Sequence, residues 1–136
     1  DYKANLVLIQ IKTSEGWIKL YEGNKAEALT LMNDAADMED STEKHPVTPG
    51  EVIPARELLG DMYLEIGEPV KALEAYQADL RRHPNRFNGL YGAGLAAEKS
   101  DNIKGAIHYY SQLLSIASNS SRPELILVKY FLKFNT

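Results

Sequence analysis

Residues 53–86, IPARELLGDMYLEIGEPVKALEAYQADLRRHPNR, contain the pattern from which the architecture can be derived. The small and aromatic residues of this stretch return 34 positions later. The matched residues are Gly60 with Gly94, Ala72 with Ala106 and Tyr76 with Tyr110. At the positions equivalent to Leu59 and Tyr63 the second copy has the smaller Ala93 and Ala97. A period of this length is typical of proteins built from stacked supersecondary units. The sequence therefore predicts an internal repeat.

A fainter copy of the pattern lies 44 residues upstream. Its members Gly16, Gly23, Ala28, Leu29 and Met32 precede Gly60, Gly67, Ala72, Leu73 and Tyr76 by that distance. The distance is one period plus ten residues, and the surplus falls in residues 43–52. Two prolines and a glycine in that segment cannot continue a helix. We interpret residues 43–52 as an insertion between helices.

Local signals divide each unit into two helices. Three capping boxes mark helix starts, because a side-chain oxygen and a later carboxylate can satisfy the free amides of a first turn. They are Asn24-x-x-Glu27, Thr48-Pro49-Gly50-Glu51 and Ser121-x-x-Glu124. Gly23, Gly67 and Pro84 are typical of helix ends. We predict helices at about residues 2–22, 25–43, 50–66, 69–82, 86–99, 103–116 and 122–134.

Composition excludes several classes of protein. The 136 residues, 44% hydrophobic and 25% charged, suit one globular domain with an ordinary core. The absence of cysteine excludes disulfides, thiolate zinc sites and cysteine nucleophiles. A net charge of -4 argues against a nucleic-acid surface, and no apolar run approaches the roughly 20 residues that span a bilayer. Because the chain opens with Asp1 rather than Met, we expect a fragment of a longer protein.

The motif Arg56-x-x-Leu59-Gly60-x-x-Tyr63, followed by Ala72-x-x-x-Tyr76 and Pro84, resembles the tetratricopeptide repeat. The resemblance continues over residues 87–120 and is weaker over 9–42. It implies an all-α, right-handed superhelix of about three antiparallel helix pairs within a single domain, 1–136. Its parts would be a degenerate repeat 9–42, the insertion 43–52, repeats 53–86 and 87–120, and a terminal capping helix 122–134.

The stretch from His45 to Met62 is similar to the carboxy-terminal segment of larger bacterial tetratricopeptide proteins without assigned activity. Proteins of that kind often begin with an export signal. The resemblance therefore implies a bacterial protein with further repeats upstream, and it leaves a cytoplasmic or exported location open.

The repeat positions are expected to hold the scaffold. Glycine and alanine let two helices approach closely, and the larger residues fill the space between neighbouring helices. A helix pair cannot bury its apolar face alone, so the pairs are expected to stack. The predicted structural positions are Leu59, Gly60, Tyr63, Ala72, Tyr76, Pro84, Gly94, Ala106 and Tyr110.

The sequence contains no visible reacting constellation. The three histidines, His45, His83 and His108, lack the spacing that brings two imidazoles to one metal on a helix. Gly89-x-x-Gly92-x-Gly94 has the wrong order for a phosphate-binding loop, and we interpret it as helix packing. We interpret the acidic cluster between Asp34 and Glu43 as a solvated helix face. We predict no catalytic residue, no metal and no cofactor, and a chain that is not an enzyme.

By the repeat resemblance, the first helix of each pair lines a concave groove. The inward-facing positions are Thr13, Trp17 and Leu20, then Glu57, Asp61 and Leu64, then Asn88, Tyr91, Leu95 and Glu98. Exposed aromatic residues would anchor a partner, and the carboxylates would favour a basic or amide-rich segment. Trp17 is equally compatible with the core.

The sequence therefore favours a protein-interaction scaffold that binds a peptide or protein segment in this groove. A second hypothesis is a structural module, because the helix predicted at 122–134 is apolar on more than one face and could mediate self-association. A third, an accessory part of an enzyme encoded upstream, stays open.

Overall fold

A computed structural model describes residues 2–42 and 53–136, and within these residues the chain forms seven α-helices and no strand. The helices are α1 (Tyr2–Tyr21), α2 (Lys25–Thr42), α3 (Ala55–Glu65), α4 (Pro69–Arg82), α5 (Phe87–Lys99), α6 (Ile103–Ala117) and α7 (Glu124–Asn135). The predicted all-α class is confirmed for this part of the chain. The insertion predicted at 43–52, with its capping box at Thr48, lies outside the described residues.

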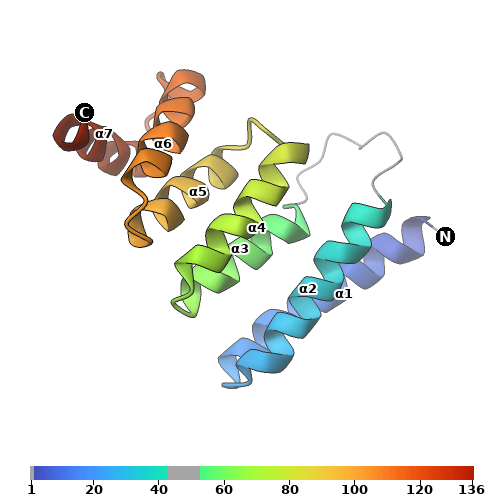
Figure 1. Ribbon diagram of the computed structural model, residues 1–136. Helices are drawn as coiled ribbons and strands as arrows, with labels where there is room; N and C mark the ends of the chain where they lie inside the picture. Colours follow the sequence, from blue (N-terminus) through green and yellow to red (C-terminus); the bar gives the residue numbers. More distant parts are fainter. Residues whose placement is uncertain (1, 43–52) are drawn as a thin grey trace.

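The helices pack in antiparallel pairs that stack in chain order (Figure 1). α1 packs on α2, α3 on α4 and α5 on α6, while α2 contacts α3 and α4 contacts α5 to join successive pairs. α7 follows on α6 at the end opposite the amino terminus. The first helices of the pairs also contact one another, α1 with α3 and α3 with α5. They therefore share one side of the stack.

The same turn joins the two helices of each pair. Gly23 and Gly67 adopt φ angles of 87° and 83°, and Asp101 takes their place in the third pair with φ of 60°. In each turn the next residue donates its amide to a carbonyl five positions back, for example Glu68 to Tyr63 at 2.8 Å and Asn102 to Ala97 at 2.8 Å. This bond closes the helix in a Schellman arrangement, which needs a left-handed residue. Aspartate tolerates that conformation better than most side chains do.

Two of the three predicted capping boxes, those at Asn24 and Ser121, lie in the described residues. Asn24 caps α2 as predicted, because its Oδ1 accepts the amide of Glu27 at 3.2 Å. Ser121 does not cap α7, which begins two residues later than predicted; Pro123 occupies the position before the helix, and no side chain caps it. The carbonyl of Arg122 instead accepts the amide of Leu125 at 3.1 Å, so a tight backbone turn replaces the predicted side-chain cap.

Glycines on the first helices receive side chains from the second helices. A Cβ built on Gly60 would lie 2.7 Å from the ring of Tyr76, and one on Gly94 would lie 2.3 Å from the ring of Tyr110. In the first pair the contact is looser and involves no ring, since a Cβ on Gly16 would lie 3.3 Å from the carbonyl oxygen of Ala28 and 3.4 Å from Met32. Glycine is required at positions 60 and 94 because the rings fill the volume in which a methyl group would stand.

The remaining predicted structural positions follow the packing expected of them. Leu59, Ala72 and Ala106 are buried, as are the rings of Tyr76 and Tyr110, and Tyr63 is half-buried. The core divides into two hydrophobic clusters. The first contains Met32 of α2 and Met62 of α3, and the second contains Tyr76 of α4 and Tyr110 of α6. Tyr63 packs against both clusters. Pro84 is exposed and follows His83, the residue that closes α4. The proline therefore ends a helix without entering the core.

The acidic cluster near the end of α2 is not simply a solvated face. Asp37 and Asp40 accept hydrogen bonds from Arg56 at 2.8 and 2.7 Å, and Glu39 accepts the amide of Ala55 at 2.8 Å. These contacts tie the end of α2 to the start of α3. The prediction holds for Asp34 and Asp37, which are exposed, but not for Glu39 and Asp40, because the stack brings a helix amino terminus and an arginine to their carboxylates.

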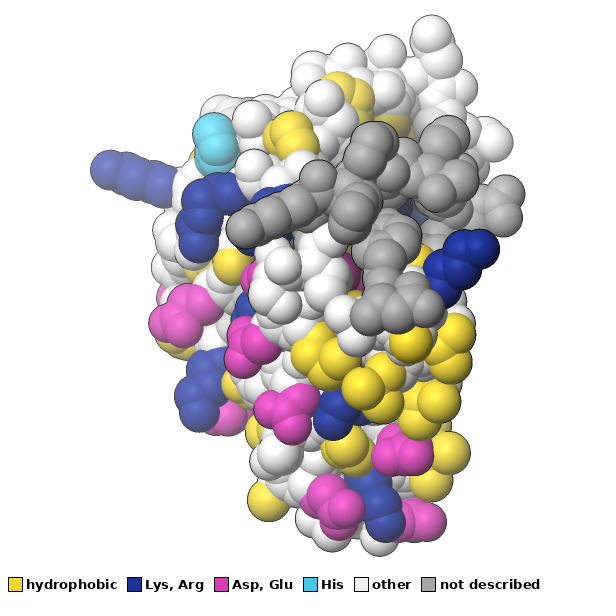
Figure 2. Space-filling view, turned by 90° about the vertical axis from the view of Figure 1, so that its right-hand side faces the viewer, with side chains coloured by type: hydrophobic (Ala, Val, Ile, Leu, Met, Phe, Trp, Pro, Cys, Tyr) yellow, Lys and Arg dark blue, Asp and Glu magenta, His cyan; other side chains and the backbone are white. Residues whose placement is uncertain are grey.

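α1, at the outer end of the stack, leaves apolar side chains in solvent (Figure 2). Val7, Ile11, Ile18 and Tyr21 follow one another at intervals of three, four or seven residues, which places them on one stripe of the helix. Tyr21 is 84% exposed. The inner face of α1 packs through Ile9 and half-buried Trp17 into the first cluster.

Gly94→Ala should destabilise the chain although alanine is the better helix former. The new methyl group would overlap the buried ring of Tyr110. Overpacking costs about 1–3 kcal/mol, against about 1 kcal/mol gained from helix propensity. We expect the free energy of unfolding, measured with urea, to fall by up to about 2 kcal/mol.

A Tyr110→Leu background provides the control, since the six-membered ring is then absent. There Gly94→Ala is expected to be neutral or stabilising. An equal loss in both backgrounds would show that the ring does not require the glycine.

Candidate functional site

Glu57 lies where α3, α4 and α5 meet, and it is completely buried. Its carboxylate accepts hydrogen bonds from Arg86 Nε at 2.8 Å and from Arg86 Nη2 at 3.3 Å. Asn88 Nδ2 donates to it at 3.0 Å. The expectation that Glu57 offers its charge to a partner in the groove was therefore wrong. The start of α5 covers it and supplies its counter-charge, so Glu57 and Asn88 hold adjacent pairs together.

The other two predicted groove carboxylates bind tyrosine hydroxyls. Tyr76 donates to Asp61 Oδ1 at 2.5 Å, and Tyr110 donates to Glu98 Oε1 at 2.9 Å. The tyrosines occupy equivalent repeat positions, but the carboxylates do not, since Glu98 stands one helical turn beyond the equivalent of Asp61. Burial raises the pKa of both phenols, and the neighbouring carboxylate raises it further.

The apolar residues predicted for the groove are partly buried. Trp17 packs with Leu20 against the first core cluster, and Leu64 packs against the second. Tyr91 and Leu95 on α5 are also half-buried. The structure thus places Trp17 and Leu64 at the margin of the core, and it leaves Tyr91, Leu95 and Glu98 together on one side of α5.

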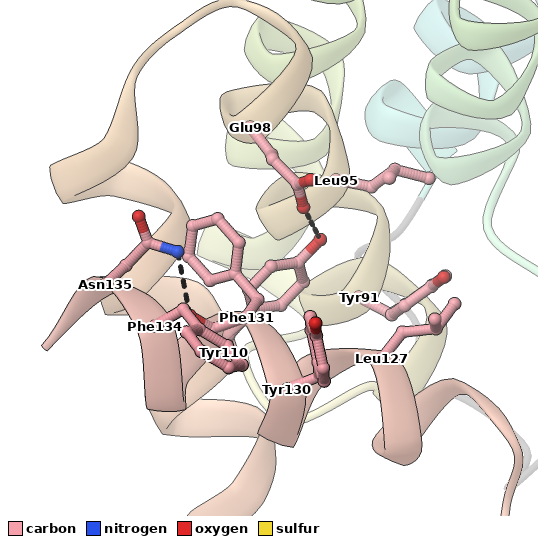
Figure 3. A pocket seen from close by; sticks show the side chains of 9 residues that line it. All are labelled: Tyr91, Leu95, Glu98, Tyr110, Leu127, Tyr130, Phe131, Phe134 and Asn135. Carbon is pink, nitrogen blue, oxygen red and sulfur yellow. Dashed lines mark hydrogen bonds between the residues drawn. The ribbon is translucent and has the colours of Figure 1, made fainter.

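These three residues form one wall of a pocket of about 310 Å³ (Figure 3). α7 forms the other wall, and Tyr110 of α6 lies between them. The lining residues are Tyr91, Leu95, Glu98, Tyr110, Leu127, Tyr130, Phe131, Phe134 and Asn135. Leu127, Tyr130 and Phe134 are 64%, 66% and 64% exposed, so the α7 wall is open to solvent.

Sequence reasoning missed the contribution of α7. Leu125 and Val128 form the buried stripe by which α7 packs on the rest of the stack. A second stripe, Leu127, Tyr130 and Phe134, follows the same spacing of three and four residues on another face of the helix. The spacing of this second stripe indicates a second apolar face of α7. Its position opposite α5 depends on how α7 packs on α6, which the spacing does not specify.

Aromatic rings make up most of the pocket wall. The ring of Tyr110 lies 6.3 Å from that of Tyr91 and 5.2 Å from that of Phe131, measured between centroids. On α7 the rings of Tyr130 and Phe134 are 4.7 Å apart. Burial raises the pKa of Tyr91, and the charges of Glu124 and Glu98 raise it further, so two carboxylates act on this phenol.

A second buried acid lies close to Glu57. Asp79 on α4 is 1% exposed, and its Oδ1 lies 3.0 Å from Nδ1 of His83. Among the described residues its Oδ2 has no hydrogen-bond partner. Burial raises the pKa of Asp79 to about 6; Glu57 adds to the rise, while His83 and Arg86 oppose it.

Within residues 2–42 and 53–136 there is no cluster of three or more histidine, aspartate or glutamate side chains that could hold a metal ion. In the same part of the chain no helix combines the length and the hydropathy that a membrane crossing requires. Comparison with models of known protein families gives no match, and comparison with curated proteins gives no significant one.

Asp79→Asn should change how stability depends on pH. Because the pKa in the folded chain, about 6, exceeds the ordinary value of 3.8, the folded state binds the proton more tightly than the unfolded state. The carboxyl group's contribution to stability therefore falls as pH rises through this interval, and asparagine removes that loss. We expect the variant to gain about 1–3 kcal/mol relative to wild type as pH rises from about 4 to just above 6.

Urea unfolding at a series of pH values measures this difference. Glu74→Gln, an exposed change on the same helix, is the matched control and should give a flat difference. A flat difference for Asp79→Asn as well, or a relative gain at low pH, would contradict the assignment.

Proposed function

We propose that this chain is a non-catalytic protein-interaction module with a tetratricopeptide-like, right-handed superhelical arrangement. Support comes from the recurrence of one turn at residues 23, 67 and 101 and of one contact between a tyrosine ring and a glycine at residues 60 and 94. Both features repeat with the spacings found in the sequence. Stacked pairs of this kind leave a side lined by first helices, which is the surface such repeats use for binding.

The observation that carries the proposal is the open aromatic pocket between α5 and α7. Exposed tyrosine and phenylalanine side chains supply contact area at a low cost in conformational entropy, and such residues dominate binding hot spots. Three predicted groove residues, Tyr91, Leu95 and Glu98, line this pocket. We assign the binding surface to the carboxy-terminal part of the stack, around α5 and α7, and assign Glu57 and Asn88 to the scaffold.

The hydrogen bonds of the buried Glu57 and of the partly buried Asp61 and Glu98 support a scaffold in preference to a reaction centre. Glu57 is neutralised by Arg86, and Asp61 and Glu98 each accept a tyrosine hydroxyl. Each of these bonds joins two helices, so each acid has a packing role. A general acid or base would instead need to reach a substrate.

Self-association through α7 is the second candidate function. Ile126, which is 71% exposed and lies outside the pocket lining, favours it together with Leu127 and Tyr130. Phe131 packs against Tyr110, so Phe131→Asp would disturb the core, and Ile126→Asp is the suitable probe. A dimer detected by light scattering and dispersed by Ile126→Asp would favour this second function.

Selection from a random peptide display library tests the groove directly. We expect wild-type protein to enrich a set of related peptides, with dissociation constants then measured by fluorescence polarisation. Tyr130→Ala should weaken their binding about tenfold or more, because it removes an exposed aromatic anchor from the pocket.

Tyr21→Ala is the matched control, since Tyr21 is also exposed but lies on α1 at the other end of the stack. It should leave every affinity unchanged. Failure to enrich related peptides, or equal losses for the two variants, would contradict the proposed groove. Glu57→Lys is unsuitable as a groove variant, because it would bury an ammonium group beside Arg86.

A further inference from the structure

The pocket between α5 and α7 combines an aromatic wall with one carboxylate. Of the nine residues that line it within the described chain, five are aromatic and Glu98 is the single charged one. Aromatic rings present negative faces, and cations bind to those faces with useful strength when they are partly desolvated. Rings and carboxylate therefore attract the same kind of ligand.

Glu98 is positioned to act on such a ligand. Its Oε1 is held by the hydroxyl of Tyr110 at 2.9 Å, which directs the carboxylate toward the ring of Tyr110 (Figure 3). Within the described residues no lysine or arginine pairs with Glu98. A carboxylate fixed by one hydrogen bond keeps a second oxygen with which to accept a charge-assisted bond.

Two aromatic rings of this chain already have a cation nearby. The guanidinium carbon of Arg122 lies 3.6 Å from the centroid of the Phe87 ring, and Lys133 Nζ lies 5.8 Å from the centroid of the Phe134 ring. Phe134 is itself a pocket residue, so its ring has a cation nearby even without a ligand. Lys133 therefore competes with an incoming cation for the ring of Phe134.

From these observations we infer that the pocket binds an arginine side chain presented by a partner peptide. This inference rests on the proposed function and adds a chemical preference to it. A guanidinium group stacks flat on aromatic rings and also donates to carboxylates, whereas an ammonium group is more strongly hydrated and does not stack. A volume of about 310 Å³ is small for a drug-sized ligand and suits one long side chain.

The test uses two end-blocked pentapeptides, acetyl-Ala-Leu-Arg-Leu-Ala-amide and its citrulline analogue, which has the same shape without the charge. Binding to the full 136-residue chain is followed by amide chemical-shift titration. We expect the arginine peptide to shift amides near Tyr91, Glu98 and Tyr130. Its affinity should be about tenfold higher than that of the citrulline peptide, the ratio that corresponds to 1.4 kcal/mol.

Glu98→Gln retains an oxygen that can accept the Tyr110 hydroxyl, so it removes the charge and preserves the packing. In this variant the preference for arginine should fall to about threefold, the part that the rings supply. Glu74→Gln, an exposed change on α4, should keep the tenfold ratio. Lys133→Gln should tighten binding of the arginine peptide, because the competing cation is gone.

Equal affinities of the two peptides for the wild-type pocket would overturn the inference and leave the groove function standing. An unchanged ratio in Glu98→Gln would also overturn it, because the carboxylate would then have no part in recognition. Absence of any pocket shift at millimolar concentrations of both peptides would overturn it as well, and the display selection judges the groove function separately.

Discussion

The structure depends on the contact between tyrosine rings of second helices and glycines of first helices. The ring of Tyr76 lies where a Cβ would stand on both Gly60 of α3 and Gly92 of α5, at 2.7 and 2.4 Å. One side chain therefore sets the spacing within a helix pair and also the spacing to the next pair. Tyr110 does the same work against Gly94 in the third pair. Because packed interiors have little free volume, rings held in this way allow few other arrangements of the helices.

The same tyrosines decide which charges remain for binding. Their hydroxyls are buried and need acceptors, and Asp61 and Glu98 supply them. Glu57 is taken up by Arg86 at the neighbouring junction. The sequence predicted that these three acids form a negative groove, whereas in the structure all three make hydrogen bonds that hold the scaffold together. Glu98 alone of the three also lines the pocket, and this double position makes it the residue on which charge recognition depends.

Repetition in the sequence predicted the helices, the turn glycines and the buried ring positions, because these are set by local spacing and by contacts within one pair. Three features depended on contacts that the repeat alone does not specify. Gly92 was interpreted only as a site of helix packing, and the structure shows that it receives a ring from the preceding pair. Glu57 is covered by residues 29 and 31 positions later. The pocket wall on α7 belongs to a helix outside the repeat pattern. The repeat therefore did not predict that Leu127, Tyr130 and Phe134 lie opposite α5.

The most direct measurement of the central contact is a double-mutant cycle between Gly92→Ala and Tyr76→Leu, with the free energies of unfolding determined in urea. If the Tyr76 ring spaces adjacent pairs, Gly92→Ala should be costly with the ring present and nearly neutral without it, which gives a coupling energy of about 1–2 kcal/mol. Additive effects, within about 0.5 kcal/mol, would mean that Tyr76 does not lock α4 against α5, and the account of the stacked pairs would be contradicted.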